Sequence, residues 1–282
     1  MSSLEIKAGT VNRESYRPSW STQILPETEE RPTVSVVVPA LNEAKNLPHV
    51  LPKIPTWVDE IILVDGNSTD NTVEVACQLC PDINVVMQQG KGKGNALRAG
   101  FAAATGDIIV MIDADGSTKP EEIPAYVGAL LAGADYVKGS RFLQGGGSAD
   151  LTIFRTLGNL GFTMLVRALF GGMFSDLCYG YNAFWKSVVE QLDLDADGFE
   201  IETLMNLRAL RSGLKISEVP SFEELRIHGE SHLNPFRDGL RVLRTVVREY
   251  TGGTNRALTG SSQDFSAQNL GGNSDISSER PA

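Results

Sequence analysis

Five short apolar runs between residues 34 and 138 constrain this chain more than any other feature of its sequence. Each run has the length and composition of a strand that is buried on both faces, and helical segments separate the runs. This alternation predicts an α/β fold, with a mostly parallel sheet, right-handed crossovers and flanking helices. The expected strands are residues 34–39, 60–65, 83–88, 107–112 and 135–138.

The second half of the chain is less regular, and its pattern predicts longer helices and shorter strands. The segments before residue 32 and after residue 250 are polar, and the later one is rich in Gly, Ser and Asn. Such composition favours disorder, so we expect disordered segments at 1–31 and 251–282 around a single domain at 32–250. In its second half we expect helices at 151–170, 200–212 and 236–249 and strands at 181–185, 215–219 and 222–227.

Charge and cysteine content narrow the functional classes. A formal net charge of −10 gives no general attraction to phosphate backbones, so we expect no nucleic-acid partner. Three cysteines give no disulfide framework, which favours a cytoplasmic protein, and Cys77 and Cys80 are interpreted as ordinary helix residues. The apolar stretch 151–173 contains Arg155 and Arg167 and is therefore a poor membrane span.

Carboxylates follow the predicted strands at the edge where parallel sheets bind ligands. Asp113 and Asp115 come directly after the fourth strand, and alternate residues there point the same way. Two such carboxylates can share one Mg²⁺ or Mn²⁺ ion, which would neutralise a departing diphosphate. The alternative is a plain acidic turn.

Other polar residues at this edge suit a nucleotide. Glu43 and Asp65 follow the first two strands and could accept hydrogen bonds from a base and a ribose, although Asp65-Gly66-Asn67 also suits a simple turn. Lys93 lies in a glycine-rich segment ahead of a helix, where anions bind. Lys93 is therefore either a diphosphate contact or a solvated loop lysine.

The motifs together resemble the family 2 glycosyltransferases of GT-A fold, and within them the dolichyl- or polyprenyl-phosphate glycosyltransferases. The resemblance covers about residues 32–240, with a nucleotide-sugar half at 32–141 and an acceptor half at 142–250. It rests on VSVVVPALNE (34–43), ILVDGNSTDNT (62–72), GKGNALRAG (92–100), GDIIVMIDADGSTKPEEI (106–123), VKGSRF (137–142), GYNAFW (180–185), GFEIE (198–202) and PSFEELRIHGESHL (220–233).

The resemblance implies a donor site and a metal site. The metal would be held by Asp113 and Asp115; Ser117 stands where many lipid-phosphate members have Gln, which leaves the third ligand open. The nucleotide sugar would contact Pro39, Ala40, Asn42, Glu43, Asp65, Lys93, Asp113, Ala114 and Asp115.

The resemblance also implies an acceptor site made of Arg141, Arg155, Arg226 and His232. A phosphate acceptor needs positioning by arginine rather than a strong base. An alcohol acceptor would need a carboxylate base, for which Glu202 ranks ahead of Asp176 and Glu200. We assign catalytic roles to Asp115, Arg141 and Glu202.

The segment 236–249 combines an apolar stripe with a basic one. Its spacing predicts either an interfacial helix on anionic lipid, giving a peripheral protein at the inner face of the membrane, or a packed helix with solvated arginines. The apolar residues are Phe236, Leu240, Leu243 and Val247, and the basic ones are Arg237, Arg241, Arg244 and Arg248.

We therefore expect transfer of a hexose, with inversion, from UDP-glucose or GDP-mannose to a polyprenyl phosphate. One alternative is the same donor chemistry on a soluble hydroxyl acceptor. A sugar-1-phosphate nucleotidyltransferase ranks low, because PALNE stands where such enzymes carry a glycine-rich loop. The sequence leaves open the donor base and sugar, the acceptor, and whether the chain forms a homodimer.

Overall fold

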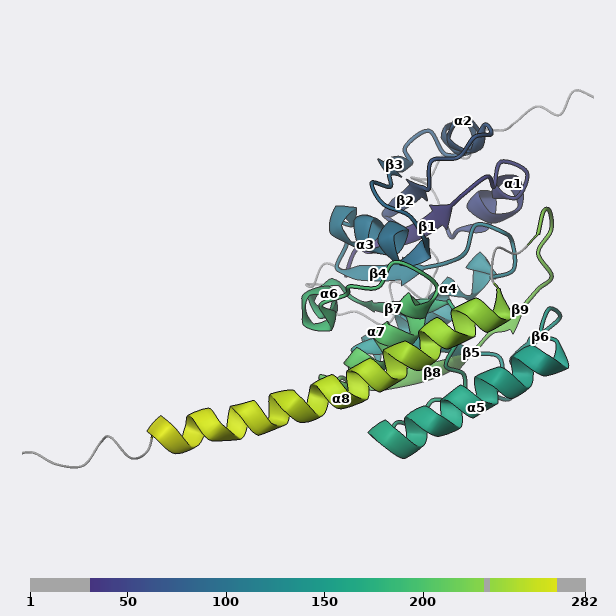
Figure 1. The fold of residues 1–282 in the computed structure, drawn as a ribbon. Helices are drawn as coiled ribbons and strands as arrows, with labels where there is room; N and C mark the ends of the chain where they lie inside the picture. Colours follow the sequence, from purple (N-terminus) through teal and green to yellow (C-terminus); the bar gives the residue numbers. More distant parts are fainter. Residues whose placement is uncertain (1–30, 231–233, 268–282) are drawn as a thin grey trace, which may run out of the picture.

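A seven-stranded sheet forms the centre of the computed structural model, which describes residues 31–230 and 234–267 (Figure 1). The strand order is β3-β2-β1-β4-β7-β5-β8, and β7 runs antiparallel to both of its neighbours, whereas the other pairs are parallel. The strands are β1 (Val34–Ala40), β2 (Glu60–Asp65), β3 (Asn84–Met87), β4 (Ile108–Met111), β5 (Tyr136–Ser140), β7 (Asn182–Trp185) and β8 (Ile216–Pro220).

The apolar runs become strands because both faces of the sheet are covered. Along β1, Val36 and Val38 pack into one core cluster, whereas Val37 packs into the cluster on the opposite face. The alternation of strand side chains thus makes one continuous apolar run serve two cores. This confirms the predicted mostly parallel sheet with helices on both faces.

Two helical layers cover the sheet. One face carries α1 (Leu47–Val50), α2 (Thr72–Leu79) and α4 (Ile123–Leu131), and the other carries α3 (Lys93–Ala103), α6 (Lys186–Leu192) and α7 (Glu200–Arg211). Short 3-10 turns, η2 (Leu51–Lys53) and η3 (Pro120–Glu122), adjoin α1 and α4. Helix α1 gives way to η2 after one turn, and Pro52 in η2 has no N–H group to donate.

The remaining elements lie at the β8 side of the molecule. Helices α5 (Ile153–Phe170) and α8 (Pro235–Ala267) run beside each other there, and a small separate sheet pairs β6 (Gly147–Ser148) with β9 (Phe222–Glu223) (Figure 1). The strand expected at 222–227 is therefore only two residues long. Helix α8 continues beyond the expected end at residue 249. None of the described helices is long and apolar enough to span a membrane.

Candidate active site

A cavity of about 970 Å³ opens at the carboxyl ends of the parallel strands. It extends from the ends of β1 and β4 to the facing sides of α5 and α8. The expected site residues that line it are Pro39, Ala40, Glu43, Lys93, Asp113, Ala114, Asp115, Arg141, Arg155, Glu202 and Arg226. Residues far apart in the sequence thus meet at the edge that the strand pattern predicted.

The glycine-rich turn before α3 serves a close backbone approach. Gly92 has a φ of 93°, and a Cβ atom on Gly94 would lie 2.3 Å from the carbonyl oxygen of Ala196. The N–H of Gly94 donates to the carbonyl oxygen of Asp197 at 2.8 Å. These contacts fix the start of α3 against the segment before α7, so Lys93 points into the cavity between two carboxylates.

Lys93 joins the two halves of the site. Its Nζ lies 2.6 Å from Oδ1 of Asp113 and 2.7 Å from Oε1 of Glu202. Burial would lower the pKa of Lys93, but the two carboxylates raise it above its ordinary value, so the lysine stays charged. Burial raises the pKa of Asp113 to about 6, against the opposing effect of Lys93.

Arg226 holds a second pair of carboxylates, at the end of the cavity formed by β1 and β4. Its Nη1 lies 3.1 Å from Oδ2 of Asp115, and its Nη2 pairs with Glu43. The backbone of the segment that contains Arg226 lies against the Asp113–Ser117 turn: the N–H of Glu224 donates to the carbonyl oxygen of Ser117 at 2.8 Å. Arg226 therefore lies with Glu43 and Asp115, whereas Arg141 pairs with other acids.

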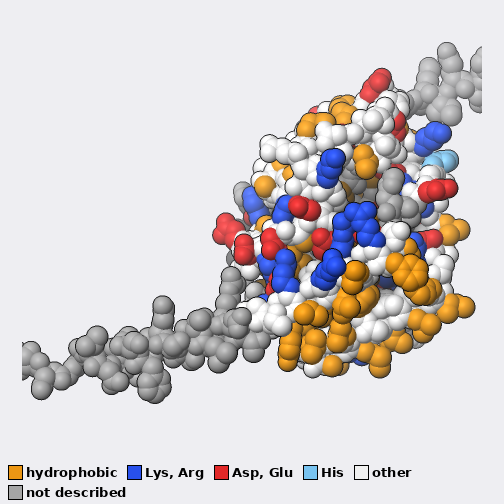
Figure 2. Space-filling view, viewed as in Figure 1, with side chains coloured by type: hydrophobic (Ala, Val, Ile, Leu, Met, Phe, Trp, Pro, Cys, Tyr) orange, Lys and Arg blue, Asp and Glu red, His pale blue; other side chains and the backbone are white. Residues whose placement is uncertain are grey.

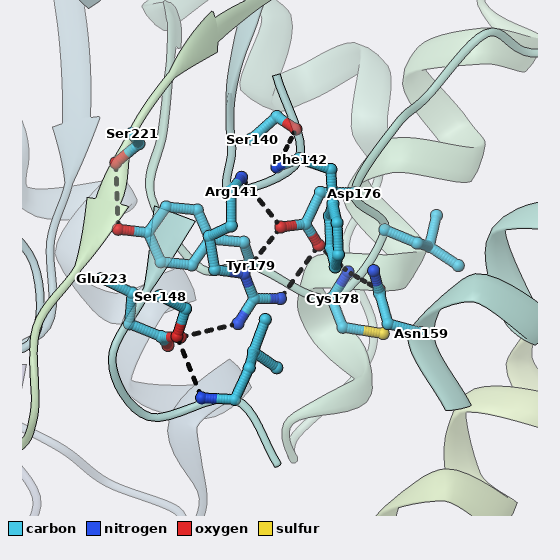
Figure 3. Close-up of polar contacts among 12 residues, drawn as sticks. Ser140, Arg141, Phe142, Ser148, Asn159, Asp176, Cys178, Tyr179, Ser221 and Glu223 are labelled. Carbon is cyan, nitrogen blue, oxygen red and sulfur yellow. Dashed lines mark hydrogen bonds and ion pairs between the residues drawn. The ribbon is translucent and has the colours of Figure 1, made fainter. Parts of the chain in front are cut away.

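Arg141 is fixed more tightly than Arg226. Its Nε and Nη2 donate to Asp176 at 2.7 and 2.9 Å, and its Nη1 donates to Glu223 at 2.9 Å (Figure 3). The guanidinium also lies 4.8 Å from the ring centroid of Tyr179. Burial would raise the pKa of Asp176, yet the hydrogen bonds and charge of Arg141 hold it below its usual value. Asp176 is fully buried and does not line the cavity, which makes it a poor general base.

Several expected residues lie off the cavity or outside the described chain. Asn42 accepts from the N–H of Thr69 at 2.8 Å and so ties two loops together. Asp65 is buried beside the lining residue Gly66; its Oδ2 accepts from Ser68, whereas its Oδ1 has no partner among the described residues. Glu200 is not a lining residue. His232 lies outside the described residues.

The sequence interpretation missed two acids that partner the arginines. Asp150 pairs with Arg155 at 2.7 Å, and Glu223 pairs with Arg141. Asp150 is five residues before Arg155, so local spacing could have suggested that pair. Glu223 is 82 residues from Arg141, and no local pattern could have found it. Cys77 and Cys178 are free cysteines.

Few protein side chains in the site could act as metal ligands. Within the described ranges, no three His, Cys, Asp or Glu side chains are grouped so as to hold a metal ion. Asp113 and Asp115 follow one another at the end of β4 and each already faces a protein cation, Lys93 or Arg226. The site thus offers two hard oxygen donors in a position that attracts positive charge, which suits Mg²⁺ or Mn²⁺ if the ligand supplies further oxygens.

The fold brings the strand-end acids and the arginines into one cavity. The family model "Glycosyl transferase family 2" matches residues 35–193. The chain therefore belongs to glycosyl transferase family 2, as its motifs indicated, and is an enzyme of the glycosyltransferase class.

Curated relatives and solved structures agree with that family. The chain is 35% identical over 209 residues to a dolichol-phosphate mannosyltransferase of Pyrococcus furiosus, covering 71% of this chain but only 59% of that relative. It is 33% identical over 205 residues to a polyprenol monophosphomannose synthase of Mycolicibacterium smegmatis, covering 67% of this chain and 77% of that one. The glucosyl-3-phosphoglycerate synthase of Mycobacterium tuberculosis, solved with Mn²⁺, UDP and its product, matches with a TM-score of 0.63 and 27% identity, over 84% and 86% of the two chains. These matches confirm the GT-A type of fold.

Proposed function

We propose that this chain transfers a hexose from a nucleotide diphosphate sugar to a polyprenyl phosphate, with inversion at the sugar carbon. The observation that carries the proposal is that one cavity is lined by a pair of carboxylates and, separately, by a pair of arginines. Asp113 and Asp115 lie at its β4 end, and Arg141 and Arg155 line it farther along. Acids that hold a metal suit a donor diphosphate, and arginines suit an acceptor phosphate.

The donor would lie across the ends of β1, β2 and β4. Its nucleoside is expected near Pro39, Ala40 and Glu43, with the unpartnered Oδ1 of buried Asp65 as a further acceptor of a base or ribose hydrogen. Asp113 and Asp115 would hold Mg²⁺ or Mn²⁺, which supplies charge neutralisation for the departing diphosphate when bound. Lys93 adds a fixed positive charge beside Asp113. The M. tuberculosis synthase was solved with Mn²⁺ and UDP together, which supports this kind of metal.

Arg141 and Arg155 would bind the acceptor phosphate. Three of the five N–H donors of Arg141 are used by Asp176 and Glu223, so its plane is fixed while two donors remain. A phosphate oxygen is already a nucleophile, so orientation and charge neutralisation suffice for attack on the sugar carbon. Glu202 pairs with Lys93, which favours a positioning role for this acid over that of a general base.

A soluble acceptor is the second candidate. It is favoured by the similarity to the M. tuberculosis synthase, one structure of which contains phosphoglyceric acid. In that case the attacking group is a hydroxyl, and Glu202 would have to accept its proton.

A product assay separates these candidates. The chain is incubated with Mn²⁺ or Mg²⁺ and with labelled UDP-glucose or GDP-mannose, in the presence of a short polyprenyl phosphate or phosphoglyceric acid. The proposal predicts label in the organic phase with one of the two donors. Label that stays in the aqueous phase as a sugar phosphoglycerate would contradict the proposal and support the soluble acceptor.

A further inference from the structure

The outer faces of α5 and α8 expose large apolar side chains. On α5 these are Ile153, Phe154, Leu157, Leu160 and Met164, of which Leu157 is 62% exposed. On α8 they are Phe236, Leu240, Leu243, Val247 and Tyr250, of which Phe236 is 80% exposed. The rings of Phe154 and Phe236 lie 5.5 Å apart and join the two faces, and Figure 2 shows hydrophobic side chains gathered over this side of the molecule. We name this surface the apolar platform.

The platform residues are additional to the core that holds these helices. Helix α8 buries Val242, Val246 and Glu249 against the domain, and Glu249 pairs with Arg208 and Arg211 of α7. The apolar stripe that was expected on this helix points away from that contact. Exposed apolar patches of this kind mark sites that bind another surface.

The charged side chains of α5 and the exposed charged side chains of residues 235–252 have one sign, although the chain as a whole carries a net charge of −10. Helix α5 contains Arg155 and Arg167 and no Asp or Glu. On α8 the acids Asp238 and Glu249 are buried, so the exposed charges between residues 235 and 252 are arginines. Arg237 and Arg244 are exposed and form no ion pair with the described residues. An apolar surface bordered by unpaired arginines complements an anionic lipid bilayer.

The cavity also ends at the platform. Its far side is lined by Phe154, Gly158 and Phe162 of α5 and by Gly239 and Val242 of α8. The cavity therefore continues from the charged strand ends into a space between the two helices that is lined by more apolar residues and glycines than polar residues.

We propose that α5 and α8 together form a membrane-docking platform that rests on an anionic bilayer and brings the open end of the cavity to the lipid surface. The role of this docking rests on the proposed function: a polyprenyl phosphate acceptor would enter the cavity between the two helices directly from the bilayer. A second copy of the chain fits this surface less well. A symmetric contact sets the same patch against itself, and the arginines would find no exposed acid on these helices to pair with.

Vesicle flotation tests the platform without any turnover. The full chain is mixed with vesicles of phosphatidylcholine alone or of phosphatidylcholine with phosphatidylglycerol. We expect it to float with the mixed vesicles, and less so as salt is raised, because exposed arginines attract anionic lipid. No flotation with the mixed vesicles at low salt would overturn the proposal.

A double leucine variant, compared with a control at an exposed apolar residue elsewhere, tests whether the platform makes the contact. Leu157→Ser with Leu243→Ser should abolish flotation, whereas Met87→Ser, at an exposed apolar residue of β3, should leave it unchanged. Equal flotation of the platform variant and wild type would overturn the proposal. Circular dichroism and thermal melting establish that each variant is folded.

Arg237→Gln with Arg244→Gln should weaken binding to the mixed vesicles about 30-fold, at about a fivefold loss per arginine. Lys53→Gln with Lys186→Gln removes the same charge from other exposed positions and should have little effect. An equal loss in both pairs would overturn the assignment of binding to the platform.

Two further measurements separate a contact with lipid from a contact between copies, and the platform from the transfer reaction. If the leucine variant converts a dimer to a monomer in sedimentation, the platform is a contact between copies and the proposal is wrong. Transfer to a short polyprenyl phosphate dispersed in detergent should survive in both platform variants. If the wild type itself showed no such transfer, the proposed function would be contradicted, whereas the flotation result would still support the membrane-docking platform.

Discussion

Two arginine–carboxylate groups in the same cavity differ in how firmly they are held. Arg141 directs three N–H donors into buried Asp176 and Glu223, and its side chain is 7% exposed. Arg226 bridges Glu43 and Asp115 from a segment outside any helix or strand, and its side chain is 18% exposed.

The difference separates a fixed group from an exchangeable one. One partner of Arg141, Asp176, is fully buried and does not line the cavity, so breaking this pair would leave a buried charge without compensation. The partners of Arg226, Glu43 and Asp115, line the cavity, where a metal ion could replace Arg226 beside Asp115 and a phosphate could replace the carboxylates beside Arg226. We infer that Arg141 keeps its partners when ligands bind and that Arg226 occupies Glu43 and Asp115 until ligands displace it.

The largest effect is expected at Asp115. Asp115→Asn keeps the shape of the side chain but removes the charge that would hold the metal, so transfer should fall about a thousandfold with the fold intact. Turnover by the product assay, with thermal melting alongside, measures both quantities. Asp82→Asn, at an exposed acid far from the cavity lining, is the control and should retain activity. Normal turnover by Asp115→Asn would refute the metal site.

Asp176→Asn should destabilise the protein by about 3–5 kcal/mol near neutral pH, because it leaves buried Arg141 without its counter-charge. The free energy of unfolding in urea, compared with that of Arg226→Gln, tests the contrast between the two groups. Arg226→Gln should cost about 1 kcal/mol or less, since its acids can be hydrated in the cavity. Equal losses would remove the distinction between a fixed and an exchangeable arginine.

The same pair should give stability a defined pH dependence. The pKa of Asp176 is lowered in the folded state, so its contribution is present above the unfolded value of about 3.9 and is lost as pH falls through the folded-state pKa. The difference in unfolding free energy between wild type and Asp176→Asn should therefore be constant near neutral pH and shrink in acid. A difference that grows in acid would contradict the assignment.

Glu202→Gln should have a moderate effect that distinguishes two roles. If Glu202 positions Lys93, the variant should raise the KM for the donor about tenfold and leave kcat for a phosphate acceptor nearly unchanged. If Glu202 were the base for that reaction, kcat would collapse instead. Steady-state kinetics over a range of pH separates these results.

The smallest effect is expected for the affinity of Arg226→Gln for Mn²⁺ in the absence of nucleotide. Because the variant removes a positive charge beside Asp115, it should bind Mn²⁺ more tightly, by several-fold for a part-exposed pair. Mn²⁺ titration followed by electron paramagnetic resonance measures this directly for Arg226→Gln. Weaker Mn²⁺ binding by the variant would mean that Arg226 supports the metal site and does not compete for it.

The sequence predicted the first half of the fold better than the second half. Strand ends are local features, so Glu43, Asp113 and Asp115 could be brought to one edge from apolar runs and parallel topology alone. The antiparallel insertion of β7 between β4 and β5 depends on pairings between distant segments and carries no local signal.

The same reasoning applies to the positions of single side chains. The resemblance places Asn42 at the nucleotide, and in the structure its φ is 58° and its side chain accepts a hydrogen bond from Thr69. The resemblance groups Arg226 with the acceptor arginines, and in the structure its segment pairs with the turn that contains Asp115. The packing of one segment against a distant one depends on tertiary contacts, which a short sequence motif does not specify.

The most direct test of the contrast between the two arginines is a crystal structure of the full chain with UDP and Mn²⁺. We predict that the contact between Nη1 of Arg226 and Asp115, 3.1 Å here, is broken, while the 2.7 Å bond between Arg141 and Asp176 is unchanged. If Arg226 stayed on Asp115 with UDP and Mn²⁺ bound elsewhere, both the donor site and the exchangeable role of Arg226 would be wrong.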